Sequence, residues 1–203
     1  MNKLVIWDFD GVIVPSWAAS YEVNKMNEPD LTEERHRSRF EGNIHYNHDV
    51  RKAIDEDKFD FWKHYIPKVN VLRFYEGIDK AIKDVAERYP CVIVSSGAHD
   101  MIDNYLKKHG FRESFKKIYG YEFHFSKVHK IEVALKEFES SKDMCMLITD
   151  TLGDVREAEE ADIPAIAVTW GYHTRTTLEK GKSHKVVETP AEILPAVVEL
   201  LSP

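Results

Sequence analysis

The sequence predicts an α/β fold, a doubly wound parallel sheet with helices on both faces and a helical segment inserted near the N-terminus. Short, continuous apolar runs recur along the chain and alternate with segments of helical spacing. One long stretch interrupts this alternation and contains no strand-like run. Because continuous apolar runs are typical of strands covered on both faces, the alternation predicts a parallel sheet flanked by helices.

The composition is that of one globular domain, or of one domain with a modest insertion. The 203 residues are 43% hydrophobic and 31% charged, which argues against a disordered or fibrous protein. The formal net charge is −7. Binding to nucleic acid or to an anionic membrane requires a broad basic surface, so we expect neither.

The two cysteines, Cys91 and Cys145, each lie in an apolar run. They are too few for a disulfide framework or a thiolate zinc site, so we expect inert core thiols in a reducing compartment. We find no leader-like N-terminal segment and no stretch near the roughly 20 apolar residues of a membrane span. These features predict a cytoplasmic protein.

The candidate strands are four apolar runs, at residues 4–7, 91–94, 144–148 and 165–168. Between them, Ile78, Ile82 and Val85 share one face of a predicted helix, and Ile131 and Leu135 share a face of another. A shorter run at residues 186–187 and a helix over residues 190–201, with proline in its first position, close the chain.

Residues 15–72, called the insert below, are rich in charge, aromatic residues and helical spacing. They predict a helical subdomain within a core of residues 1–14 and 73–203. Phe61 and Tyr65 are four residues apart, as are Trp62 and Ile66, and this spacing favours a small apolar core of the insert over contact with a ligand. We expect residues 33–39 to form a solvated face, starting from an acidic helix N-terminus after Thr32.

Polar residues follow directly after three of the apolar runs. The sequence Asp-Phe-Asp-Gly occupies residues 8–11, Ser-Ser-Gly occupies residues 95–97, and Thr-Asp occupies residues 149–150, with Asp154 four residues further on. In a parallel α/β sheet, ligands bind outside the carboxyl ends of the strands. We therefore expect these side chains to gather at one edge of the sheet.

The acids at this edge suit phosphoryl chemistry assisted by a hard cation. Asp8, Asp10 and Asp150 offer oxygen ligands, which Mg²⁺ prefers, and grouping like charges without a cation would be costly. With a cation present, Asp8 is the candidate nucleophile. Asp10 is the candidate general acid and base, and Ser95 offers a hydroxyl to the phosphoryl oxygens.

A positive group is needed to offset charge on the transferring phosphoryl group, and the candidates are Lys127 and Lys130. Ser126 has the character of a helix N-cap, which places Lys127 at the start of the helix and Lys130 nearly one turn of 5.4 Å further away. We therefore favour Lys127. Taken alone, either lysine would be interpreted as a solvated helix residue.

Taken together and in this order, the motifs resemble those of haloacid-dehalogenase-superfamily hydrolases of the phosphatase type. The resemblance spans essentially the whole chain. It implies a Rossmann-like core with the first strand central, Asp8 as nucleophile and Asp10 as general acid and base. It also implies Mg²⁺ held by Asp8, the backbone carbonyl of Asp10 and Asp150, with Asp154 supporting the metal directly or through water.

The resemblance also bears on the type of reaction and on the insert. Members that dehalogenate lack the second acid, so Asp10 favours phosphoryl chemistry. The insert is similar to the small helical cap type, which closes over the site and selects small substrates. Residues 74–78 resemble the usual return from such a cap, with Gly77 supplying a turn before the next helix.

Other polar residues are weaker candidates for a functional site than the motifs described above. Histidine pairs at residues 45 and 48 and at 124 and 129 offer no third ligand, so a metal role for them is disfavoured. Residues 170–173, Trp-Gly-Tyr-His, either line the entrance of the site or form an ordinary exit from a strand. Four arginines of the insert are candidates for contact with an anionic substrate: Arg35, Arg37, Arg39 and Arg51.

The function that these features predict is Mg²⁺-dependent hydrolysis of a small phosphorylated metabolite through an aspartyl-phosphate on Asp8. A phosphomutase of the same superfamily, which passes the phosphoryl group to a sugar hydroxyl, is the alternative. A non-enzymatic phosphoacceptor or binding module is disfavoured, because the candidate nucleophile ends the first strand and is followed by the insert. The sequence favours no particular oligomeric state.

Overall fold

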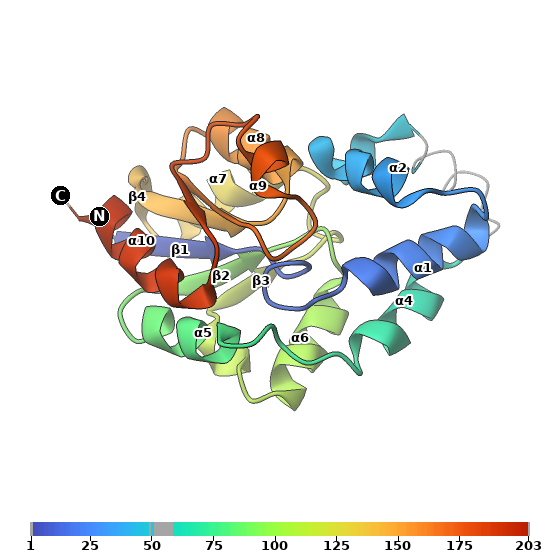
Figure 1. The fold of residues 1–203 in the computed structure, drawn as a ribbon. Coiled ribbons are helices and arrows are strands. Elements are labelled where there is room, and N and C mark those ends of the chain that lie inside the picture. The colour runs from blue at the N-terminus through green and yellow to red at the C-terminus, as the bar shows by residue number, and fades with distance from the viewer. Residues whose placement is uncertain (1, 49, 51–58, 203) are drawn as a thin grey trace.

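The computed structural model describes residues 2–48, 50 and 59–202 and shows a twisted sheet flanked by helices (Figure 1). In the described part of the chain, the sheet has six parallel strands in the order β3-β2-β1-β4-β5-β6. The strands are β1 (Asn2–Trp7), β2 (Cys91–Val94), β3 (Lys117–Tyr119), β4 (Ser140–Thr149), β5 (Ala165–Val168) and β6 (Lys185–Val187). Val5 of β1 lies opposite Cys91 and Met146, so the first strand is central, as the resemblance implied.

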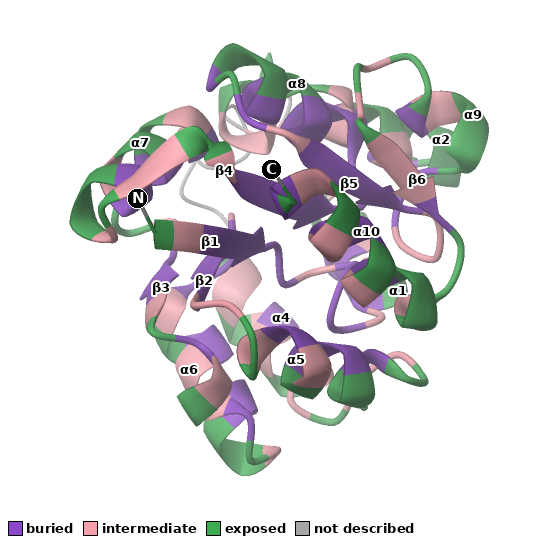
Figure 2. Cartoon of the chain, turned by 90° about the vertical axis from the view of Figure 1, so that its left-hand side faces the viewer, coloured by how far each residue is buried: buried purple, intermediate pink, exposed green. Residues whose placement is uncertain are grey.

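Helices cover both faces of the sheet (Figures 1 and 2). One face packs against α5 (Ile78–Ala86), α6 (His99–Lys108) and α10 (Ile193–Leu201), and the other against α7 (Lys127–Glu137) and α8 (Leu152–Glu160). Successive residues of β1 divide between these two cores: Val5 and Trp7 face the first, and Leu4 and Ile6 the second. Burial of alternate side chains on both sides explains the continuous apolar runs, and the predicted fold class is confirmed.

The predicted bounds agree with the observed strands wherever the apolar run fills the strand. Residues 91–94 and 165–168 are β2 and β5, whereas β4 begins at Ser140, in a polar segment that the apolar pattern does not mark. The prediction missed β3, an edge strand of three residues that starts with a lysine and, among the described residues, pairs only with β2. The final helix is divided into a 3₁₀ turn, η4 (Pro190–Glu192), followed by α10.

Gly77 and Ser126 carry the local roles predicted for them. Gly77 has a φ of 83° and forms the N-cap of α5, a conformation that favours glycine. The side chain of Ser126 accepts a hydrogen bond from the backbone N–H of His129, so Ser126 is the N-cap of α7. Lys127 is therefore the first residue of that helix. The thiols of Cys91 and Cys145 are free and buried.

The described elements of the insert follow β1 and lie beyond the carboxyl ends of the strands (Figure 1). They are α1 (Trp17–Asn27), α2 (Glu33–Ser38), the 3₁₀ turns η1 (Arg39–Glu41) and η2 (Ile44–Tyr46), and α4 (Phe61–Val69). Helix α1 packs along α4. The division into residues 15–72 and the remaining core stays a prediction. No helix in the described ranges is long and apolar enough to span a bilayer.

Two expectations for the insert are corrected by this packing. Residues 33–39 do not form a purely solvated face, because His36 and Arg39 are only 1% and 3% exposed. One side of α2 lies against α1, where the ring of His36 contacts Trp17 and Tyr21. The aromatic residues of α4 also do more than fill a core, since Phe61, Trp62 and Tyr65 line a cavity.

Candidate active site

The acids predicted at the strand ends meet at one edge of the sheet. Asp8 follows β1 directly, and its backbone N–H donates to the carbonyl of Ile148 in β4 at 2.9 Å. A cavity of about 620 Å³ opens at this edge. Its walls combine residues of the core with residues of the insert, and the core residues include Asp8, Asp10, Ser95, Lys127 and Asp154.

Lys127 bridges two of the carboxylates. Its Nζ lies 2.8 Å from Asp8 Oδ2 and 2.8 Å from Asp154 Oδ2, and Thr149 donates to the same oxygen of Asp154 at 2.6 Å. Burial alone would lower the pKa of Lys127, but the two carboxylates outweigh it and hold the pKa above its usual value. The ammonium therefore stays charged beside Asp8. In return, and against the effect of burial, it holds the pKa of Asp154 below its usual value.

Lys130, the alternative lysine, makes a different contact. It is fully buried, and its Nζ donates to the backbone carbonyl of Ser95 at 2.6 Å. Burial, and then the charge of Lys127, lowers the pKa of Lys130 to about 7. Lys130 thus supports the loop after β2, and Lys127 is the lysine that contacts Asp8.

The side chains of Asp10 and Ser95 both lie against Gly97. A Cβ on Gly97 would lie 3.1 Å from Asp10 Oδ2 and 3.2 Å from Ser95 Oγ, so any side chain there would crowd both groups. The hydroxyl of Tyr65 donates to Asp10 Oδ1 at 2.5 Å. Burial raises the pKa of Asp10, and the bond from Tyr65 opposes that rise.

Asp150 is fully buried and held by the segment 170–173. Its Oδ2 accepts the backbone N–H of Tyr172 at 2.6 Å, and a Cβ on Gly171 would lie 2.2 Å from that oxygen. Segment 170–173 is therefore part of the site and more than a strand exit. The other oxygen, Oδ1, is buried with no hydrogen-bond partner among the described residues. Burial raises the pKa of Asp150 to about 8.

The donor groups at this edge fit Mg²⁺. Within the described ranges, no three side chains of His, Cys, Asp or Glu form a ready metal site. The set implied by the resemblance is Asp8, the backbone carbonyl of Asp10 and Asp150, with Asp154 as support directly or through water. In the structure, Oδ2 of Asp154 accepts hydrogen bonds from Lys127 and Thr149. All of these donors are oxygens. A bound hard cation would satisfy Oδ1 of Asp150, which has no hydrogen-bond partner among the described residues.

Some residues that the sequence did not single out also belong to the site. Glu157 Oε1 accepts the backbone N–H of Lys127 at 2.8 Å and the side-chain amide of Asn43 at 2.9 Å. Glu157 follows Asp154 by three residues, and this helical spacing could have indicated it. No comparable signal marked Asn43, and the spacing of Tyr65 indicated only a core aromatic residue of the insert.

The other candidates from the sequence have identifiable surroundings. The ring of His45 stacks on Phe125 with 4.9 Å between centroids, and the rings of His124 and His129 lie 4.3 Å apart. Of the arginines, Arg37 donates to the carbonyl of Tyr172, and Arg39 lines the cavity. Arg51 lies outside the described residues.

A doubly wound sheet with clustered acids and a lysine at its carboxyl edge, beneath a helical insert, is the arrangement of an α/β enzyme with its site at the ends of the strands. Residues 5–168 match the family profile described as haloacid dehalogenase-like hydrolase. The chain belongs to this family, and the resemblance read from the motifs is confirmed.

Individual relatives agree with this assignment. The chain is 26% identical over 131 residues to a phosphoglycolate phosphatase of Synechococcus elongatus, and the match covers 64% of this chain and 62% of that relative's own length. A solved structure described as a predicted phosphatase of Clostridium acetobutylicum superposes with a TM-score of 0.79 at 20% identity, covering 98% of this chain and 99% of that one. A haloacid dehalogenase-like hydrolase of Streptococcus pneumoniae gives a TM-score of 0.76 at 18% identity, covering 96% and 98%. These two structures share the fold.

Proposed function

We propose that the protein is a Mg²⁺-dependent phosphatase that hydrolyses a small phosphate monoester through an aspartyl-phosphate on Asp8. The observation that carries the proposal is the ammonium of Lys127 at 2.8 Å from Asp8 Oδ2, on the wall of a cavity large enough for a metabolite. A charged lysine beside a buried carboxylate provides the stabilisation that a phosphoryl group needs as it reaches the nucleophile. The phosphatase named among the relatives supports the same reaction.

In this reaction, a carboxylate oxygen of Asp8 attacks the phosphorus of the ester, and the bond to the leaving oxygen breaks. Asp10 gives its proton to that oxygen, and the product alcohol departs. Asp10 then takes a proton from a water molecule, whose oxygen attacks the phosphorus. The bond to Asp8 breaks, so phosphate is released and both acids return to their starting states.

The remaining groups orient and neutralise the phosphoryl oxygens. Lys127 supplies positive charge, and Ser95 supplies a hydroxyl. Bound by Asp8, the carbonyl of Asp10 and Asp150, Mg²⁺ would offset the negative charge of the carboxylates and of the phosphoryl group. Asp154 accepts a second bond from the ammonium of Lys127.

The insert acts in this proposal as a cap over the site. Its side chains form much of the cavity wall, and Tyr65 reaches Asp10 directly. Such a cover excludes water and limits the size of the substrate. The free, buried cysteines accord with a reducing compartment, and we place the enzyme in the cytoplasm.

The test is release of phosphate from p-nitrophenyl phosphate by the purified protein with MgCl₂. We expect Asp8→Asn to abolish turnover, and Asp143→Asn, a change at an exposed aspartate, to preserve it. Turnover that survives in Asp8→Asn would refute the nucleophile. With glucose 1-phosphate as substrate, release of free phosphate supports a phosphatase, whereas formation of an isomerised sugar phosphate would show a phosphomutase.

A further inference from the structure

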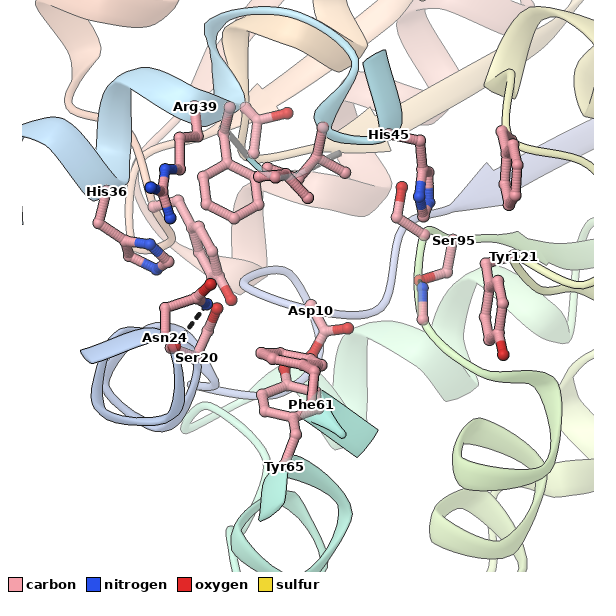
Figure 3. A pocket seen from close by; sticks show the side chains of 18 of the residues that line it. Asp10, Ser20, Asn24, His36, Arg39, His45, Phe61, Tyr65, Ser95 and Tyr121 are labelled. Carbon is pink, nitrogen blue, oxygen red and sulfur yellow. Dashed lines mark hydrogen bonds between the residues drawn. The ribbon is translucent and has the colours of Figure 1, made fainter. Parts of the chain in front are cut away.

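The cavity has a polar end that the proposed reaction does not use. It is formed by Ser20 and Asn24 of α1, His36 of α2 and Arg39 of η1, all of which line the cavity. Figure 3 shows these four residues on one side of Asp10, and His45, Ser95 and Tyr121 on the other. Asp10 thus stands between the phosphoryl site and this polar end.

His36 is the residue whose bonding is incomplete. It is only 1% exposed, and neither ring nitrogen has a hydrogen-bond partner among the described residues. Burial, and then the charges of Arg39 and Arg37, lowers the pKa of His36 to about 3, so its ring is neutral at pH 7. A neutral imidazole offers one N–H donor and one acceptor. Leaving both unsatisfied in a buried place costs free energy that a ligand bonded to them would recover.

Two of the arginines near His36 are paired with acidic side chains. Arg39 lies 2.7 Å from Glu28 Oε2, and Arg35 lies 3.2 Å from the same oxygen and 3.9 Å from Asp30 Oδ2. Two arginines are therefore matched by two carboxylates. Arg37 stacks on the ring of Trp17 and does not line the cavity. A carboxylate entering this end would lose its hydration, would find Arg39 already paired with Glu28, and would meet the carboxylate of Glu28, which also lines the cavity.

The other residues that line the cavity favour a neutral, hydroxyl-bearing ligand. Asn24 donates its side-chain amide to the carbonyl of Ser20 at 2.8 Å, and its side-chain oxygen is an acceptor (Figure 3). Phe40, Phe61 and Trp62 supply aromatic walls. A volume of about 620 Å³ lies within the range of cavities that enclose metabolite-sized ligands. A two-carbon phosphate ester would leave most of it empty.

We propose that the substrate is the phosphate monoester of a neutral, sugar-sized polyhydroxyl group, whose hydroxyls bond to His36 and Asn24 while the phosphoryl group meets Asp8. This inference rests on the proposed phosphatase function and specifies its substrate class. The proposed substrate differs from phosphoglycolate, which the name of the Synechococcus relative contains, because phosphoglycolate is a two-carbon ester that carries a carboxylate.

The test compares two phosphate esters of equal chain length that differ in one terminal group. Sorbitol 6-phosphate ends in a hydroxymethyl group and 6-phosphogluconate in a carboxylate, with 2-phosphoglycolate as the small acid. We expect kcat/KM for sorbitol 6-phosphate to exceed the values for both acids by about 10-fold or more. An equal or higher value for either acid would overturn the inference.

A variant assigns the preference to His36. His36→Phe keeps a ring against Trp17 and Tyr21 and removes both nitrogens. We expect it to lower the ratio of kcat/KM for sorbitol 6-phosphate to that for p-nitrophenyl phosphate by about 10-fold. The matched control is His109→Phe. The ring of His109 also packs on aromatic residues, and its Nε2 has no hydrogen-bond partner in the described part of the chain, but His109 does not line the cavity. An unchanged ratio in His36→Phe would overturn the assignment.

Calorimetric titration of the Asp8→Asn protein with the same esters separates the two proposals. Tighter binding of sorbitol 6-phosphate than of 6-phosphogluconate supports the substrate class even if p-nitrophenyl phosphate is not hydrolysed. Equal or weaker binding of sorbitol 6-phosphate contradicts the substrate class even if p-nitrophenyl phosphate is hydrolysed. The proposed reaction itself is judged by p-nitrophenyl phosphate alone.

Discussion

The hydroxyl of Tyr65 donates a hydrogen bond of 2.5 Å to Asp10 Oδ1 and so joins α4 of the insert to the loop after β1. The rest of the Tyr65 side chain is buried, with its ring stacked on Phe61 at 4.8 Å. Asp10 is the proposed general acid and base. A residue of the insert therefore orients the group that protonates the leaving oxygen, and Tyr65 acts as a positioning residue.

Tyr65→Phe is expected to lower kcat for p-nitrophenyl phosphate by about 10-fold, the effect of ~1.4 kcal/mol, with a smaller change in KM. The ring is retained, so the loss reports the bond to Asp10. Steady-state kinetics at saturating MgCl₂ provide the measurement. Tyr119→Phe is the control, since that hydroxyl bonds to Glu137 outside the cavity. A change confined to KM would contradict a role in orienting Asp10.

Lys127 and Lys130 are buried to the same degree but should differ in their contribution to stability. Lys127→Met leaves Asp8 and Asp154 buried without their counter-charge, and we expect a loss of about 3–5 kcal/mol in the free energy of unfolding. Lys130→Met removes one bond to a backbone carbonyl and also a poorly solvated ammonium, so its cost should stay below about 1.5 kcal/mol. Urea denaturation measures both. Equal losses would show that the ion pair at Asp8 is not the stabilising contact.

The site residues that lie outside the insert could be predicted, because a local sequence pattern marks the position of each one. Asp8 and Asp150 end continuous apolar runs, and parallel strands bring such ends to one edge. The N-cap at Ser126 fixed the start of α7 and thereby separated Lys127 from Lys130. Edge strand β3 was not predicted, because it has only three residues and begins with a lysine. Such a short segment at the edge of the sheet contains no long apolar run.

The site residues of the insert could not be predicted, because contacts between elements far apart in the sequence determine where their side chains lie. His36 lies in a run of charged residues that reads as exposed, and only packing of α2 on α1 buries it. Tyr65 has the spacing of a core aromatic residue, and it is largely that, yet its hydroxyl reaches Asp10. Helical periodicity reports which face is buried and does not report what that face meets.

Stabilisation of the protein by Mg²⁺ should depend on the carboxylate of Asp150. We expect MgCl₂ to raise the Tm of the unaltered protein and EDTA to reverse the rise, because a ligand that binds only the folded state stabilises it. Asp150→Asn keeps an oxygen for the N–H of Tyr172 but loses the charge, so its Tm should respond much less to MgCl₂. Thermal denaturation across a MgCl₂ series measures this, with Asp143→Asn as the control. An equal rise in Asp150→Asn would remove Asp150 from the ligand set.

The histidine at position 36 should make the protein sensitive to mild acid. Burial lowers its pKa from the usual 6.5 to about 3 in the folded state. Below pH 6.5 the unfolded chain therefore binds a proton that the folded chain does not, and the free energy of unfolding falls with decreasing pH by up to about 1.4 kcal/mol per pH unit. Phenylalanine cannot take up this proton.

Relative to the unaltered protein, His36→Phe should thus gain about 1.6 kcal/mol in the free energy of unfolding between pH 6.5 and pH 5. Urea denaturation at pH 8, 7, 6 and 5 measures the difference. Between pH 8 and pH 7 the imidazole is neutral in the folded state and mostly neutral in the unfolded state, so the two proteins should change nearly in parallel, which serves as the internal control. Curves that stay parallel down to pH 5 would mean that His36 accepts a proton in the folded protein, and the polar end of the cavity would then carry a positive charge suited to a carboxylate.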